Sequence, residues 1–245
     1  MGSEWSIWRR LYATRLLRLA KRRLKYRQLE EALGISQSLL ARYVTGLVIP
    51  GARQAERIIE VLEPMAGIEE IVLESARRYS GYIDLVPLLS DTDALFVAAY
   101  RLASRFSQER VDKVLVPEAS GISLATIIAT MIGADLVTAR RRKENPLAEY
   151  IEEHLVEPPN IRRSFYVRKD LLGPGDRVLV VDDIVHSGLT LRLVSRIARK
   201  AGAEVLGVAS IVVVGERWRE SVSPRVRVEA LLVLPEASAT LPEPA

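Results

Sequence analysis

The stretch Val178-Leu-Val-Val-Asp-Asp-Ile-Val-His-Ser-Gly-Leu-Thr190 joins an apolar run, two acids and a loop of small residues. Val178 to Val181 is continuous and mostly β-branched, which is typical of a strand covered on both faces in a parallel sheet. Asp182 and Asp183 follow at its carboxyl end, where open α/β sheets hold their ligands. The pattern predicts a parallel α/β domain with a ligand site at this strand end.

The loop His186-Ser-Gly-Leu-Thr190 leads into an amphipathic helix predicted for Leu191 to Ala201. The free N–H groups at the start of such a helix can hold an anion. Gly188 lets the backbone come close to a ligand, and Ser187 and Thr190 add hydroxyl donors. We therefore expect a phosphate group at this loop.

At these residues the chain resembles the type I phosphoribosyltransferases, whose fingerprint is an apolar strand, two acids, three variable residues, Thr or Ser, Gly, any residue, and Thr or Ser. All of the fixed positions are met. The alternative is a strand that happens to end in an acidic turn, but two adjacent carboxylates at a buried strand end repel each other without a counter-charge.

The resemblance implies a parallel sheet flanked by helices and a site for phosphoribosyl pyrophosphate (PRPP). Asp182 and Asp183 would face its ribose hydroxyls. Mg²⁺ would bind through PRPP, with the two acids as candidate ligands. The residues expected to wrap the 5′-phosphate are His186, Ser187, Gly188, Leu189 and Thr190.

A second strand, loop and helix precede this motif. The strand is predicted at Lys113 to Val116 and the helix extends through Met131, with small residues between them. Their position one βα unit before the acids suits the fold. In the family the equivalent loop holds pyrophosphate, and the residues standing there are Glu118, Ala119, Ser120 and Gly121.

The basic run Arg140-Arg-Arg-Lys143 directly follows a strand predicted at Asp135 to Thr138. Similar enzymes carry a basic residue at this place and a mobile flap beyond it, which makes Arg140 and Lys143 candidates for contact with pyrophosphate. The alternative is a solvated charge run. The polar stretch that follows, to about Arg163, is expected to be the flap.

The remaining core elements are predicted from apolar periodicity. A helix is expected at Asp91–Phe106, and a strand beside the fingerprint strand at Ser164–Val167. Further strands are expected at Val205–Val214 and Val226–Leu234. Trp218 follows the first of these and could stack on a base, although packing is the alternative.

Composition excludes several classes of protein. The chain has no cysteine and only two histidines, so a disulfide framework, a cysteine-ligated zinc site and a histidine-rich metal site are not expected. No run approaches the ~20 apolar residues of a membrane span, and the N-terminus lacks the apolar region of a signal peptide. We expect a cytoplasmic protein.

The positive charge is concentrated at the N-terminus. Residues 1–80 hold 14 Lys+Arg against 9 Asp+Glu, whereas residues 81–245 hold 21 against 22. A helix is predicted around Trp8, Tyr12 and Leu16, with arginines on its other faces. Such a basic segment is expected of a protein that binds a phosphate backbone, with an amphipathic membrane helix as the alternative.

Two short helices with a turn between them follow this basic helix. They are predicted at Tyr26–Leu33 and Gln37–Thr45, with Gly34 supplying the positive φ of the turn and Ser36 as N-cap. The segment resembles the helix-turn-helix of the lambda-repressor-like class. One position departs from that class, because Glu30 stands where alanine is usual. The resemblance implies contacts with double-stranded DNA through Gln37, Ser38 and Arg42.

Helices through Arg53–Leu62 and Ile68–Tyr79 would complete a helical bundle. We expect a helix-turn-helix domain at 1–80, a phosphoribosyltransferase-like domain at 81–235 and a flexible tail at 236–245. This arrangement resembles a group of archaeal transcription regulators and, more distantly, the bacterial purine repressor. A helical cap that only packs on the catalytic domain is the alternative for the N-terminal part.

Two functions remain open from the sequence. The first is a DNA-binding regulator whose phosphoribosyltransferase-type domain binds PRPP, a nucleotide or a nucleobase as effector. The second is an active purine or related phosphoribosyltransferase, in which His186 would be the acid–base residue beside the catalytic acids Asp182 and Asp183. A structural role in the phosphate loop is the alternative for His186. A homodimer is expected in either case.

Overall fold

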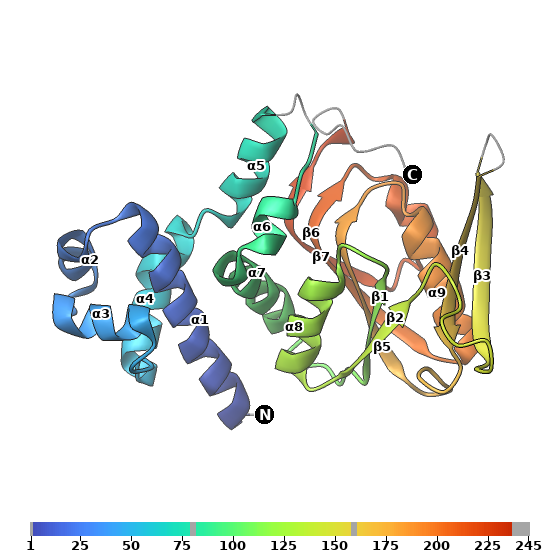
Figure 1. The fold of residues 1–245 in the computed structure, drawn as a ribbon, viewed down its shortest axis with the longest axis horizontal. Helices are drawn as coiled ribbons and strands as arrows, with labels where there is room; N and C mark the ends of the chain where they lie inside the picture. The colour runs from blue at the N-terminus through green and yellow to red at the C-terminus, as the bar shows by residue number, and fades with distance from the viewer. Residues whose placement is uncertain (1, 79–81, 158–160, 237–245) are drawn as a thin grey trace. The chain divides into compact units, whose positions relative to one another are not determined.

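The computed structural model describes residues 2–78, 82–157 and 161–236, which form two compact units (Figure 1). One unit comprises Met1–Tyr79 and Ile83–Tyr100, and the other comprises Ser80–Tyr82 and Arg101–Ala245. The first unit thus takes in residues beyond the expected boundary at 80, and the functional division of the chain remains a prediction. The predicted flexible tail lies, apart from Glu236, outside the described residues.

The N-terminal unit is helical. Its elements are α1 (Gly2–Arg23), α2 (Tyr26–Leu33), α3 (Gln37–Thr45), α4 (Ala52–Leu62), the 3₁₀ helix η1 (Glu63–Met65), α5 (Ile68–Arg78), α6 (Val86–Ser90) and α7 (Thr92–Ser104), the last of which continues into the second unit. The predicted bounds of α2 and α3 are confirmed. The short helix α6 was not predicted.

An apolar stripe on α1 forms the centre of this unit, as its spacing predicts. Tyr12 and Leu16 are buried, and the Tyr12 ring stacks on Tyr100 with ring centroids 4.1 Å apart. Trp8 packs beside Phe96 at 6.4 Å. Aromatic pairs of this kind add to the free energy gained by burying their area.

The turn between α2 and α3 has the expected left-handed glycine. Gly34 has φ 69° and its N–H donates to the Glu30 carbonyl oxygen. Ser36 occupies the N-cap position of α3, but its side chain makes no capping hydrogen bond. Leu40 and Tyr43 of α3 are buried, whereas Val44 is only partly buried.

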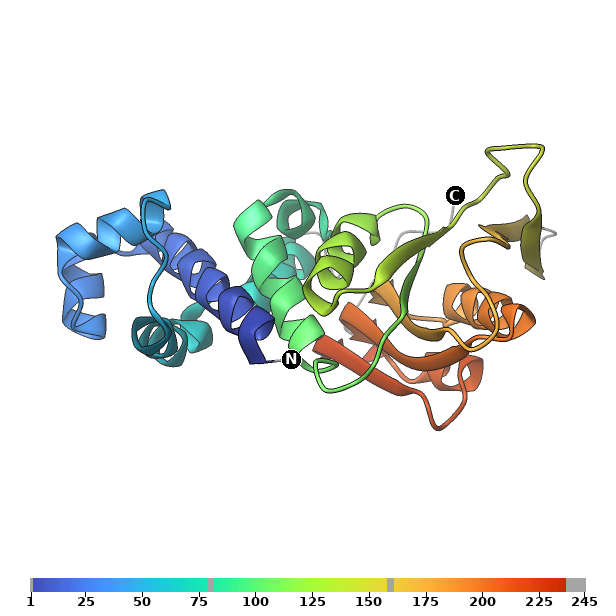
Figure 2. The ribbon, with the colours of Figure 1, turned by 90° about the horizontal axis from the view of Figure 1, so that it is seen from below.

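The second unit is built on a five-stranded, wholly parallel sheet in the order β2-β1-β5-β6-β7 (Figure 2). Its strands are β1 (Lys113–Pro117), β2 (Asp135–Ala139), β5 (Arg177–Val185), β6 (Glu204–Val214) and β7 (Arg227–Leu234). The helices are α8 (Ile122–Ile132), α9 (Leu189–Ala201) and the 3₁₀ helix η2 (Arg217–Ser221). The predicted parallel α/β fold is confirmed.

Both faces of the central strand β5 are buried, which explains its unbroken apolar run. Val178 and Val180 belong to a core cluster that includes Leu193 and Ile197 of α9. Leu179 and Val181 point to the opposite face, because side chains alternate along a strand, and they are buried there. The β1-to-β2 and β5-to-β6 crossovers run in opposite directions along the sheet, so right-handed connections place α8 and α9 on opposite faces.

One strand prediction is wrong. The predicted strand Ser164–Val167 lies within β4 (Ile161–Arg168), which pairs with β3 (Tyr150–Glu157) in a separate antiparallel hairpin instead of joining β5. The neighbours of β5 are β1 and β6. The buried side chains of β4, Phe165 and Val167, pack into the α9 core, so their apolar character reports burial but does not identify the pairing partner.

Candidate functional site

The acid pair lies within β5 and not after it. The strand continues through Val185, and Asp182 still pairs in register with Ser210 of β6. The backbone N–H of Asp183 donates to Asp182 Oδ1 at 3.1 Å, and Ile184 N–H donates to Asp183 Oδ1 at 3.0 Å. The two carboxylates therefore turn back on their own backbone near the carboxyl end of the central strand.

The environment of Asp182 disfavours its charge. Burial raises the pKa of Asp182 well above its ordinary value, and repulsion from the Asp183 carboxylate raises it further. A cation or the hydroxyl groups of a sugar would relieve this repulsion. The pair consequently has the chemistry of a binding position for such groups.

The loop assigned to pyrophosphate lies directly against the acid pair. A Cβ added at Gly121 would sit 3.4 Å from both Asp182 Cα and Asp183 N. The loop contains a cis peptide between Glu118 and Ala119, and Ala119 and Ser120 are exposed. Two motifs that are about sixty residues apart in the sequence thus meet at one edge of the sheet, as parallel strands require.

Arg140 is brought to the same loop. It follows β2, and its Nη1 lies 3.5 Å from Glu118 Oε1, while Arg141 N–H donates to Glu118 Oε2 at 2.9 Å. Glu118 therefore connects the basic run Arg140–Lys143 to the predicted pyrophosphate loop through these hydrogen bonds. Lys143 is directed elsewhere, since its Nζ lies 3.5 Å from Glu152 and 5.2 Å from the ring centroid of Tyr166 in the hairpin.

The predicted phosphate loop forms the N-terminus of α9. The helix begins at Leu189, two residues earlier than predicted, and Gly188 at its N-cap has φ 75°. The first amide groups of a helix have no intrahelical acceptor and point outward. Gly188 is also required by packing, because a Cβ there would lie 2.5 Å from Ser221 Oγ and 2.7 Å from Trp218 Cα.

Glu236 joins this site although the sequence did not indicate it. Its Oε1 lies 2.7 Å from His186 Nε2, and Arg217 Nη1 lies 3.5 Å away. The hydrogen bond with His186 lowers the pKa of Glu236. Because β7 is parallel to β5, a residue just after β7 reaches the edge that carries His186, and this topological signal could have identified it.

Trp218 packs as part of the fold. Its side chain is buried, and its indole Nε1–H donates to the Gly215 carbonyl oxygen at 3.0 Å. The ring face is covered in part by Arg219, whose guanidinium carbon lies 4.8 Å from the ring centroid. Of the two interpretations of Trp218, packing is the one that these contacts support.

In the described part of the chain, no group of three or more His, Cys, Asp or Glu side chains is placed so that it could hold a metal ion by itself. Mg²⁺ is commonly held by one or two carboxylates together with substrate phosphates. The pair Asp182 and Asp183 fits that donor set. In the described ranges, no helix is both long and apolar enough to cross a membrane.

The three residues expected to contact DNA share the exposed side of α3. Gln37, Ser38 and Arg42 are all exposed. Gln37 Nε2 donates to Glu30 Oε2 at 2.7 Å, so the departure from the usual alanine places an acceptor beside α3. Within the described residues Arg42 forms no ion pair, and its guanidinium is available to a partner.

The basic helix α1 does not present the free patch that its sequence suggests. Most of its arginines are used inside the unit, and the ion pairs are Arg9–Glu56, Arg15–Asp93, Arg18–Asp93 and Arg22 with both Asp91 and Asp93. A further arginine, Arg10, donates to the Pro50 carbonyl oxygen at 2.7 Å. Much of the N-terminal positive charge therefore stabilises the fold.

Comparison with known families agrees with both units. Residues 89–234 match the phosphoribosyl transferase domain family, and residues 15–63 match a helix-turn-helix family. The crystal structure of adenine phosphoribosyltransferase from Rhodothermus marinus superposes with a TM-score of 0.57 at 27% identity, covering 62% of this chain and 86% of that one.

Relatives of known sequence are named for different bases. An adenine phosphoribosyltransferase of Anaeromyxobacter dehalogenans is 35% identical over 126 residues, which are 51% of this chain and 72% of that protein. A xanthine phosphoribosyltransferase of Geobacillus thermodenitrificans is 30% identical over 157 residues, which are 62% of this chain and 78% of that protein. The acid pair, its two loops and these matches lead to one conclusion: the chain belongs to the phosphoribosyl transferase domain family and carries an N-terminal helix-turn-helix.

Proposed function

We propose that this protein is a DNA-binding transcriptional regulator whose phosphoribosyltransferase-type domain binds PRPP or a nucleotide or nucleobase as effector. The observation that carries the proposal is the helix-turn-helix match together with the exposed Gln37, Ser38 and Arg42 on α3. An arginine or an amide on such a helix can bond to base edges in the major groove of DNA.

The effector site is the edge of the sheet where the two loops meet. Asp182 and Asp183 hold the ribose hydroxyls of PRPP, and the amides and hydroxyls of residues 186–190 hold its 5′-phosphate. The loop of residues 118–121 with Arg140 receives the pyrophosphate. Lys143 joins it only after leaving its contact with Glu152 in the hairpin. Mg²⁺ bound with PRPP would neutralise charge beside the acids, where burial and then repulsion from Asp183 raise the pKa of Asp182.

The protein acts as a homodimer on double-stranded DNA. Two helix-turn-helix units in a dimer recognise half-sites about one DNA turn, ~34 Å, apart. Regulation requires the effector to bind the DNA-competent and DNA-incompetent states with different affinity, a difference typically worth ~1–3 kcal/mol. Such a difference changes DNA affinity by roughly 5- to 150-fold.

The test is fluorescence anisotropy of the full chain on its own upstream DNA at fixed salt, with and without PRPP and Mg²⁺. We expect binding that resists competitor DNA and shifts when PRPP is added. Binding that stays weak, salt-sensitive and independent of sequence under both conditions would reject the regulatory function.

An active nucleobase phosphoribosyltransferase is the second candidate. It is favoured by the 35% identity to an adenine phosphoribosyltransferase and by the position of His186 in the loop after the acid pair. In this function His186 exchanges a proton with the base, and Glu236 orients its ring. A panel of adenine, xanthine, hypoxanthine, guanine and orotate with PRPP and Mg²⁺ would detect it as release of pyrophosphate.

A further inference from the structure

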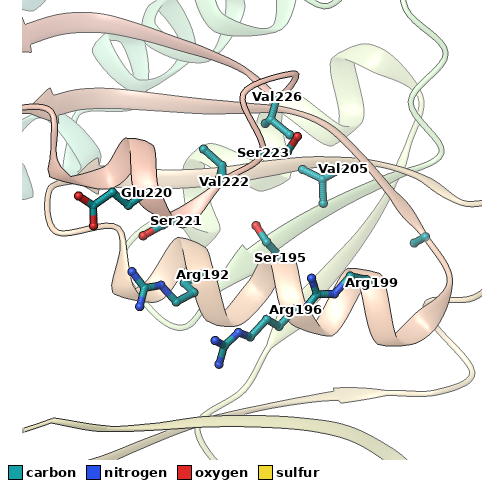
Figure 3. A pocket seen from close by; sticks show the side chains of 11 residues that line it. Arg192, Ser195, Arg196, Arg199, Val205, Glu220, Ser221, Val222, Ser223 and Val226 are labelled. Atoms are coloured by element: carbon teal, nitrogen blue, oxygen red, sulfur yellow. The ribbon is translucent and has the colours of Figure 1, made fainter.

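The connection between β6 and β7 leaves part of α9 uncovered. Parallel strands need a crossover of about a dozen residues or more, which is usually an α-helix. Here residues 215–226 supply only the five-residue 3₁₀ helix η2 and an irregular segment. A groove therefore runs between this segment and the outer side of α9 (Figure 3).

The groove has the dimensions of a small-molecule site. Its volume is about 580 Å³, within the range of ~300–1,000 Å³ that is usual for ligand pockets. Arg192, Arg196 and Arg199 line it from α9, and Val222 and Val226 line it from the crossover segment. It thus combines a strongly basic wall with a small apolar one.

The arginines of the groove are not neutralised by the fold. The lining contains these three arginines and a single acid, Glu220. Among the described residues neither Arg192 nor Arg199 forms an ion pair, and Arg196 has only a 4.0 Å contact with Glu153. Arg192 and Arg199 are seven residues apart on α9 and so about 10.5 Å apart along its axis, a distance that two long side chains can close around one anion.

Two hydroxyl groups in the same walls are also unused. Ser195 Oγ and Ser221 Oγ are buried and have no hydrogen-bond partner among the described residues. Ser195 lies between Arg192 and Arg199 along the helix, and Figure 3 shows its hydroxyl directed toward the crossover segment. Buried polar atoms normally find a partner, and an oxygen-rich ligand with a small local adjustment would supply one.

We propose that this groove is a second ligand site, separate from the PRPP edge, which binds a nucleotide carrying two or more phosphates. The three guanidinium groups match several phosphate charges, since arginine binds phosphate through paired N–H donors. The valines accept the less polar base or sugar. This proposal is independent of DNA binding by the N-terminal unit.

The groove shares residues with the phosphate loop. Ser221 lines the groove and also packs on Gly188, where an added Cβ would lie 2.5 Å from its Oγ. Both sites also use α9, from its N-terminus to Arg199. Occupancy of the groove is therefore expected to change affinity at the loop, and by linkage the effect is reciprocal.

The test is calorimetric titration of ADP into the full chain without Mg²⁺. The paired change Arg192→Gln with Arg199→Gln should weaken ADP binding about tenfold or more, as expected for loss of charge-assisted hydrogen bonds. Thr190→Val, which changes the first turn of α9 at the phosphate loop and leaves the lining of the groove intact, should keep the groove affinity. Arg192→Lys should lose less affinity than Arg192→Gln, because a charge without the paired geometry is retained.

The matched control is Arg110→Gln, which removes an exposed positive charge of the same unit outside the groove and should leave ADP binding unchanged. Thermal unfolding of each variant checks that the fold is intact, and the single change Arg199→Gln, an exposed residue, should weaken ADP in the same direction. ADP affinity lost in Thr190→Val but kept in the arginine pair would overturn the proposal. The proposal would also be overturned if ADP showed no saturable binding, or if the double variant Arg192→Gln with Arg199→Gln lost affinity only for DNA.

Discussion

The imidazole of His186 and the carboxylate of Glu236 lie 2.7 Å apart, Nε2 to Oε1, although fifty residues separate them in the sequence. The contact lowers the pKa of Glu236, so the interaction is present above the ordinary carboxylate pKa of ~4.3 and is lost as the pH falls through the lowered value. His186→Ala should return the Glu236 pKa toward its ordinary value. Carboxyl-carbon NMR titration of the variant measures this directly.

The same pair distinguishes a catalytic from a structural His186. If the residue transfers a proton to the base, His186→Ala should reduce nucleotide synthesis by ~10²–10⁴-fold. Glu236→Gln should reduce it less, because the ring remains and only its orientation is disturbed. Full activity in His186→Ala, measured as pyrophosphate release, would assign the histidine to the loop structure alone.

Asp182→Asn should separate binding from stability. A pKa raised in the folded state means that stability is present below the ordinary pKa and is lost as the pH rises through the raised value. A neutral amide removes that loss, so the variant should melt at a higher temperature than the wild type at pH 7. PRPP binding should fall below detection in calorimetry, both in Asp182→Asn and in the double variant that also carries Asp183→Asn. A variant that keeps its PRPP affinity would remove the pair from the ribose site.

Gly188 should tolerate alanine less well than other glycines of positive φ. The left-handed conformation alone costs an alanine ~1–2 kcal/mol. At Gly188 the new Cβ also meets Ser221 Oγ and Trp218 Cα, which adds ~1–3 kcal/mol of overpacking. Gly175→Ala is the matched control, because Gly175 has φ 85° with nothing within 4 Å. Chemical denaturation followed by tryptophan fluorescence measures the difference, and equal losses would refute the packing role.

Arg42→Ala should weaken DNA binding by ~1–3 kcal/mol if the side chain contacts a base, with loss of preference at one position of the site. Arg27→Ala is a suitable control, since Arg27 is also exposed but pairs with Glu31 on α2 at 3.1 Å. Anisotropy titrations of both variants on cognate and scrambled DNA provide the measurement. Identical affinities for Arg42→Ala and the wild type would exclude Arg42 from the interface.

The N-terminal unit should lose stability in acid. Burial alone would raise the pKa of Asp91, but the hydrogen bond from Arg22 and those from the backbone N–H groups of Ala94 and Asp93 leave it below the ordinary value. The stabilisation is present above the ordinary pKa, near ~3.9, and disappears as the pH falls through the lowered one. In Asp91→Asn the melting temperature, followed by circular dichroism, should fall less between about pH 5 and 2 than it does in the wild type. An equal fall in both proteins would assign the loss of stability to other carboxylates.

Local features of this protein were predictable because their causes are local. Apolar residues at steps of three and four and a single glycine of positive φ define α2, the turn and α3 at the predicted bounds. The unbroken apolar run Val178 to Val181 identified a parallel strand buried on both faces, because burial on both faces requires every side chain of the strand to be apolar. The two anion loops could be placed together as well, since strand ends in a parallel sheet share one edge.

Long-range partners were decided only by the tertiary structure. The pattern of β4 reports burial, and the fold alone determines that it pairs with β3 instead of β5. The arginines of α1 look like a free patch until the fold brings Asp91 and Asp93 to them. The groove beside α9 is likewise invisible in the sequence, and the contact of Glu236 with His186 follows only once the parallel placement of β7 beside β6 is known. Periodicity specifies which side chains are buried or charged, whereas the choice of partner depends on how distant segments pack, and that free energy is shared over the whole fold.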